Sequence, residues 1–184
     1  MGYWQRIRRK RAPTDINKLI RTVLGLVYID LRKYSIETNL NLGEQLSPII
    51  GNEVQLQQVI LNLVMNAIES MNSAEPRVLS ITSESKRDDV LVSIADTGGG
   101  IDTANLNRIF QPMFTTKAHG MGMGLSICKS IIESHNGLIW VSANAPRGSV
   151  FHFELPVHQF GERKPDLSDR VTAFTPSLAK EVIE

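Results

Sequence analysis

The pattern of apolar and polar residues divides the chain into short helices and strands. Apolar residues recur at helical spacing over residues 16–27, which predicts a helix capped by Thr14 or Asp15. Residues 36–42 alternate loosely and indicate a strand. Residues 48–52 are typical of a turn that leads into the next helix.

Two strand pairs occupy the second half of the pattern. Residues 77–85 and 90–95 predict one hairpin, and residues 138–142 and 150–155 predict another. Between the two hairpins, the apolar residues of segment 124–135 recur at helical spacing, which predicts a helix. The Asn-Gly pair that follows suits a left-handed C-terminal cap. The order of elements predicts an α/β two-layer sandwich, in which helices cover one face of a mixed, largely antiparallel sheet.

Composition narrows the classes of protein. The 184 residues are 42% hydrophobic and 21% charged, which is normal for one globular domain. No apolar run is long enough for a membrane span, and we expect no signal peptide. Cys128 is the only cysteine, which excludes an intrachain disulfide and a cysteine-based metal cluster and fits the reducing cytoplasm.

Charge adds little about partners. The net charge of +1 does not indicate a polyanionic partner, so no nucleic acid is expected. Basic residues crowd residues 6–11, where a solvated segment and contact with nucleic acid or an anionic membrane are both open interpretations. We expect a basic lead-in at residues 1–14, a domain at 15–156 and a loose polar tail at 157–184.

A polar stripe follows the otherwise apolar helix predicted at residues 53–71. Its members recur every three or four residues and therefore share one face: Gln55, Gln58, Asn62, Asn66 and Glu69. The stripe faces either water or a ligand. Asparagines are poor helix formers, which favours the ligand, and the asparagine carbonyl oxygen suits Mg²⁺.

Asp96 ends an apolar strand in phase with Val90, Val92 and Ile94, so it should face the core. A buried carboxylate needs a partner. One interpretation is that Asp96 caps the turn made by the glycines after it. The other is that it accepts a hydrogen bond from an exocyclic amine such as that of adenine.

Two glycine clusters extend the nucleotide interpretation. Gly98 and Gly100, taken alone, indicate only a turn. Gly120, Gly122 and Gly124 precede a helix, whose first backbone amides favour phosphate oxygens, so they suit a lid over phosphates. Together with Asp96 and the polar stripe, the clusters predict an ATP site.

The segment between the clusters completes the predicted lid, which spans about residues 114–123. Lys117 is placed to reach phosphate charge, although a solvated loop lysine explains it equally well. Phe110, Pro112 and Phe114 are expected to anchor the base of the lid.

Taken together, these segments resemble the ATP-binding catalytic domain of sensor histidine kinases, within the superfamily of gyrase, Hsp90 and MutL. Residues 55–71 are similar to the N box, 95–101 to the G1 box, 109–117 to the F box and 120–137 to the G2 box. The resemblance covers about residues 15–156. It implies the Bergerat fold, a mixed sheet backed by three helices.

The resemblance also implies roles for single residues. Asn66 would be the Mg²⁺ ligand, and Asp96 would bind the adenine amine. Asn62 stands where hydrolysing relatives carry a glutamate base, and an amide cannot deprotonate water. Glu69 replaces the basic residue of many kinases, which moves the expected phosphate contact to Lys117, the third implied catalytic residue beside the two asparagines. The full set of nucleotide contacts it implies is Asn62, Asn66, Asp96, Gly98, Gly100, Ile101, Phe110, Thr115, Thr116, Lys117, Gly120, Gly122, Met123, Gly124 and Leu125.

The implied function is transfer of the γ-phosphate of Mg·ATP to a histidine, as in two-component sensor kinases. The first histidine is His119, and none has the context of a phosphoacceptor, so the acceptor is expected in a separate helical dimerisation domain, with a response regulator downstream. A stand-alone regulatory ATP-binding module or an anti-sigma-factor-type serine kinase is the alternative. Asn62 argues against an ATPase with mechanical output.

Overall fold

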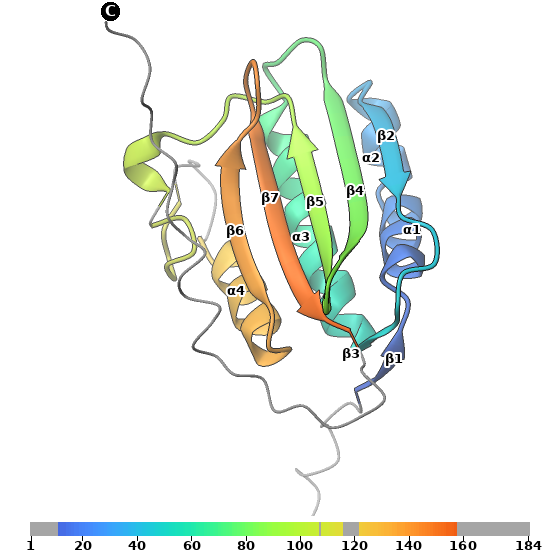
Figure 1. Ribbon diagram of the computed structural model, residues 1–184. Helices are drawn as coiled ribbons and strands as arrows, with labels where there is room; N and C mark the ends of the chain where they lie inside the picture. The colour runs from blue at the N-terminus through green and yellow to red at the C-terminus, as the bar shows by residue number, and fades with distance from the viewer. Residues whose placement is uncertain (1–10, 107, 116–121, 158–184) are drawn as a thin grey trace, which may run out of the picture.

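The computed structural model describes residues 11–106, 108–115 and 122–157. Within these residues the chain forms two layers, a five-stranded sheet and helices on one side of it (Figure 1). In sheet order the strands are β2 (Glu37–Leu42), β4 (Val78–Lys86), β5 (Asp89–Asp96), β7 (Ser149–Pro156) and β6 (Leu138–Ala143). Strand β2 runs parallel to β4, and the other neighbours are antiparallel. Both predicted hairpins and the mixed, largely antiparallel sheet are confirmed.

The helical layer contains the three predicted helices. They are α1 (Ile16–Leu26), α3 (Glu53–Ser70) and α4 (Gly124–Ser134). Asp15 caps α1, because its side chain accepts the backbone N–H of Lys18 at 3.2 Å. Asn52 caps α3 in the same way. A short helix, α2 (Tyr28–Lys33), follows α1 and was not predicted, since six residues are too few to show a helical period.

The turn predicted at residues 48–52 is wrong in part. Ile49–Gly51 is a short strand, β3, which pairs antiparallel with β1 (Ala12–Thr14). Three residues carry too little alternation to be recognised as a strand, and the pairing partner lies far away in the sequence. Val157 bridges to Ile49, so the end of β7 is held beside this small sheet.

The core lies between the sheet and the helices. Strand β5 buries every second side chain, and Asp96 continues the buried series of Val90, Val92 and Ile94, as its phase predicted. Helix α3 is buried along most of its length and packs against α1, α4 and β5. No helix in the described part of the chain is long and apolar enough to cross a membrane.

His135 joins the start of α3 to the end of α4. Its ring is 2% exposed, and Nε2 accepts the backbone N–H of Asn52 at 3.0 Å. The other nitrogen, Nδ1, lies 2.8 Å from the carbonyl oxygen of Ile131 and donates to it in the neutral ring. Burial lowers the pKa of His135 below 6.5, and the charge of nearby Arg11 lowers it further.

This pKa predicts acid-sensitive folding. Below about pH 6.5 the unfolded chain binds a proton at His135 before the folded protein does, so the free energy of unfolding should fall as the pH drops. In His135→Gln, chemical denaturation at neutral and acidic pH should show a weaker pH dependence. Burial also lowers the pKa of His152, so some dependence should remain. An unchanged dependence in His135→Gln would contradict the neutral, buried ring.

Candidate functional site

A cavity of about 810 Å³ lies between α3, the end of β5 and the start of α4. Many of the residues predicted to contact a nucleotide line it: Asn62, Asn66, Asp96, Gly100, Ile101, Thr115, Gly122, Met123, Gly124 and Leu125. Gly98 and Phe110 lie beside it without lining it. Thr116, Lys117 and Gly120 lie outside the described residues, as does most of the predicted lid. The structure therefore gathers distant parts of the sequence around one space of a size suited to a small ligand.

Asp96 is the buried charge of this cavity. Its side chain is 2% exposed, and Oδ1 accepts hydrogen bonds from the Gly98 backbone N–H and the Ser70 hydroxyl, each at 2.8 Å. Burial raises the pKa of Asp96, while these two bonds and a backbone hydrogen bond from Ser149 lower it. Asp96 therefore caps its own turn, as one interpretation held, and also lines the cavity, as the other required.

Gly98 is a glycine because α3 approaches its backbone closely. A Cβ atom at this position would lie 2.6 Å from the Ser70 carbonyl oxygen, closer than real Cβ contacts. Gly148 in the β6–β7 hairpin approaches from the other side, where an added Cβ would lie 2.8 Å from the Asp96 carbonyl carbon. The Asn144 side chain of the same hairpin donates to the Asp96 carbonyl oxygen at 2.8 Å. The turn after β5 is thus clamped between α3 and this hairpin.

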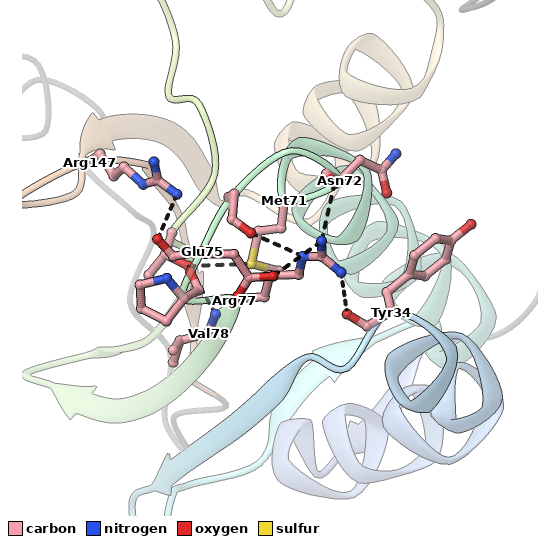
Figure 2. Close-up of polar contacts among 10 residues, drawn as sticks. Tyr34, Met71, Asn72, Glu75, Arg77, Val78 and Arg147 are labelled. Carbon is pink, nitrogen blue, oxygen red and sulfur yellow. Dashed lines mark hydrogen bonds and ion pairs between the residues drawn. The ribbon is translucent and has the colours of Figure 1, made fainter.

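Thr97 anchors the same turn to the loop that follows α3. Its hydroxyl donates to the Pro76 carbonyl oxygen at 2.6 Å and accepts the Val78 N–H at 2.9 Å. In that loop, Arg77 donates to the Tyr34 carbonyl oxygen at 2.8 Å and pairs with Glu75 at 3.3 Å (Figure 2).

Two further contacts extend this network. Arg77 Nε donates to the Ala74 carbonyl oxygen at 3.1 Å, and Arg147 of the β6–β7 hairpin donates to the Glu75 carbonyl oxygen at 3.2 Å (Figure 2). Through these bonds the end of α2, the loop after α3 and the hairpin hold one another in place beside Asp96.

The polar stripe of α3 largely faces the cavity. Gln58, Asn62, Asn66 and Glu69 line it, which supports the ligand-facing interpretation. The Asn62 amide donates to the Gly124 carbonyl oxygen at 3.4 Å and lies 3.7 Å from the Cys128 sulfur. Asn62 therefore connects α3 to the start of α4.

Cys128 is a core residue, as the sequence predicted. It is fully buried, and burial raises the pKa of its thiol to about 11. A thiol with so high a pKa is protonated at neutral pH and unreactive.

The side-chain atoms around the cavity that could ligate a metal ion determine which metal the cavity suits. Among the described residues, no group of three or more His, Cys, Asp or Glu side chains is placed to hold a metal ion. The α3 face offers the Asn66 side chain, whose amide oxygen is a hard ligand. Such a site fits Mg²⁺, which keeps several waters and completes its shell with substrate phosphates, better than Zn²⁺.

The aromatic residues lie at one side of the cavity. Phe114 lines it, while Phe110 packs edge to face on Phe151, with ring centroids 6.4 Å apart. Phe151 also lines the cavity, so Phe110 supports the wall from behind. The Arg108 guanidinium lies 4.8 Å from the centre of the Phe114 ring.

Several residues that line the cavity were not predicted from the sequence, and Ser70 and Ser149 are the two of them that hydrogen-bond to Asp96. Ser149 is buried and in phase with Phe151 and Phe153 on β7, so its place on a buried strand face was the available signal. Ser70 lies four residues after Asn66, one turn further along the polar stripe.

The close approach at Gly98 predicts a position-specific effect of alanine. Gly98→Ala should reduce the free energy of unfolding by about 1–3 kcal/mol, because the Ser70 backbone has to move. Gly99→Ala is the matched control, since a Cβ there meets nothing within 4 Å. Chemical denaturation of both variants measures the difference. Equal stability of the two variants would mean that the end of α3 moves away from residue 98 at no cost in free energy.

Comparison with known proteins identifies the family. Residues 51–159 match the family described as histidine kinase-, DNA gyrase B- and HSP90-like ATPase. The sensor protein TdiS of Thauera aromatica is 38% identical over 152 residues, which are 80% of this chain and 28% of TdiS. The catalytic domain of histidine kinase ThkA has a TM-score of 0.73 at 38% identity, covering 80% of this chain and 96% of that chain.

A structure of ThkA in complex with the response regulator protein TrrA matches with a TM-score of 0.70 at 36% identity, covering 80% of this chain and 42% of that chain. The chain thus spans only 28% of the length of TdiS, but nearly all of the isolated ThkA catalytic domain. From its fold and these matches, the chain belongs to the histidine kinase-, DNA gyrase B- and HSP90-like ATPase family.

Proposed function

We propose that this chain binds Mg·ATP and is the catalytic domain of a two-component sensor histidine kinase, which transfers the γ-phosphate to a histidine of a separate helical domain. The observation that carries this proposal is the buried Asp96 carboxylate on the wall of a cavity that α3 lines with amides. Its setting is the cytoplasm, where ATP and a response regulator are available.

Each part of the cavity has a role in this proposal. Asp96 accepts a hydrogen bond from the exocyclic amine of adenine and so orients the base. The Asn66 side-chain oxygen would hold Mg²⁺, and the ion would supply charge neutralisation to the phosphates. Thr115, Gly122 and Leu125 lie on the wall near the start of α4, where phosphates are expected. Lys117 completes the proposed phosphate contacts.

Asn62 favours transfer over hydrolysis. It lines the cavity one turn before Asn66, at the position where the resemblance places the glutamate base of hydrolysing relatives. A side-chain amide does not accept a proton near neutral pH, so this position cannot activate water. ATP bound here would persist until an external nucleophile arrives.

Phosphotransfer predicts dependence on a second domain. The isolated chain with labelled Mg·ATP should show no stoichiometric self-labelling, whereas adding the helical phosphoacceptor domain of a related sensor kinase should produce acid-labile label on that domain. Acid-stable label would instead indicate a serine kinase. Stoichiometric acid-labile label on the chain alone would overturn the assignment of an external acceptor.

Asp96→Asn tests the base contact. The amide presents a donor as well as an acceptor, so ATP affinity measured by calorimetry should fall by about 1–3 kcal/mol while the fold remains intact. Asp89→Asn, the same change at the other end of β5, should bind ATP like the wild type. Equal affinity of Asp96→Asn and wild type would remove Asp96 from the site.

A further inference from the structure

Ser70, the last residue of α3, donates to the carboxylate at the base of the cavity. Its Oγ lies 2.8 Å from Asp96 Oδ1 and also 2.8 Å from the Ala67 carbonyl oxygen. A hydroxyl has one proton, so these two acceptors compete for it. The ionised carboxylate is the stronger acceptor, since hydrogen bonds to charged groups are roughly twice as strong as neutral ones.

The donors around Asp96 leave little room for a further one. A carboxylate has about four acceptor positions. The described residues fill three of them, through the Ser70 hydroxyl, the Gly98 backbone N–H and a backbone hydrogen bond from Ser149. One position is left, which is enough for a single N–H of an exocyclic amine.

We propose that Ser70 is a positioning and specificity-determining residue for the purine base, because its hydroxyl holds Asp96 in the orientation that accepts one amine and repels a carbonyl oxygen. The inference rests on the proposed function, since it requires a nucleotide in this cavity. Adenine presents an amine at the relevant edge of the ring, whereas guanine presents a carbonyl oxygen. An ionised, fixed carboxylate therefore selects adenine.

Loss of the Ser70 hydroxyl should weaken the preference for adenine over guanine by making Asp96 easier to protonate. Burial already raises the pKa of Asp96, and the Ser70 bond opposes that rise. Without the bond, more of the carboxyl group is protonated at a given pH, and a protonated carboxyl can donate to the guanine carbonyl oxygen. Among the described residues, the other charged ones that line the cavity are Glu69 and Asp102, and Ser70→Ala leaves both in place.

The charged residues on the neighbouring segments are also unchanged by this substitution. Arg77 and Glu75 belong to the loop after α3, and Arg147 belongs to the β6–β7 hairpin. Any shift in the titration of Asp96 in Ser70→Ala therefore comes from the lost hydroxyl.

Ser134 offers a matched control. It is the last residue of α4, as Ser70 is of α3, and its hydroxyl donates to the Ile131 carbonyl oxygen three residues earlier at 2.7 Å. Ser134 does not line the cavity. A purely structural hydroxyl at the end of a helix would thus give the same effect in Ser134→Ala as in Ser70→Ala.

The experiment uses the full chain as wild type, Ser70→Ala and Ser134→Ala. Calorimetry gives the Kd values of Mg·ADP and Mg·GDP between about pH 5 and about pH 8, and carbon-detected NMR follows the Asp96 carboxyl in the nucleotide-free protein. In Ser70→Ala we expect Mg·ADP to bind about tenfold more weakly at neutral pH. The preference for ADP over GDP should shrink, and Asp96 should titrate at higher pH. Ser134→Ala should match the wild type in all three measurements.

The outcomes separate the two proposals. If the wild type binds ADP but Ser70→Ala keeps both the wild-type ADP preference and the wild-type titration of Asp96, the role of Ser70 is overturned and the proposed function stands. If the wild type binds neither nucleotide, the proposed function is overturned, and the specificity role of Ser70 falls with it. Equal effects in Ser70→Ala and Ser134→Ala would reduce Ser70 to a structural hydroxyl.

Discussion

The fold has to keep one carboxylate, that of Asp96, almost out of water. A buried charge is unfavourable by several kcal/mol unless hydrogen-bond donors compensate it. The donors come from three separate segments: the end of α3 at Ser70, the turn after β5 at Gly98 and the start of β7 at Ser149. Because these segments are far apart in the sequence, the charge is stabilised only when the sheet, α3 and the β6–β7 hairpin are all in place.

The same burial makes Asp96 unfavourable for stability at neutral pH. Its pKa is higher in the folded protein than in the unfolded chain, so its contribution favours folding only at low pH and is lost as the pH rises. The apolar core between the sheet and the helices has to offset this loss. This unfavourable contribution and the place of Asp96 on the cavity wall both support the proposed role of the carboxylate in binding.

Elements long enough to show a periodic pattern of apolar residues were predicted from the sequence, and shorter elements were missed. Period-two alternation located β5 and fixed the inward phase of Asp96, and helical periodicity located α3 and its polar stripe. The short pairing of β1 with β3 and the six-residue helix α2 have too few residues for a period. Ser70 and Ser149 continue the polar stripe of α3 and the buried phase of β7, but these patterns do not show what the two side chains contact, and only the folded structure brings them to Asp96.

Asn62 both lines the cavity and connects α3 to the start of α4. Its amide donates to the Gly124 carbonyl oxygen at 3.4 Å and lies near Cys128, so it joins α3 to the helix that follows the predicted lid. A carboxylate at this position would repel that carbonyl oxygen instead of donating to it. The Asn62 amide, which cannot act as a general base, therefore also fits the contact between the two helices.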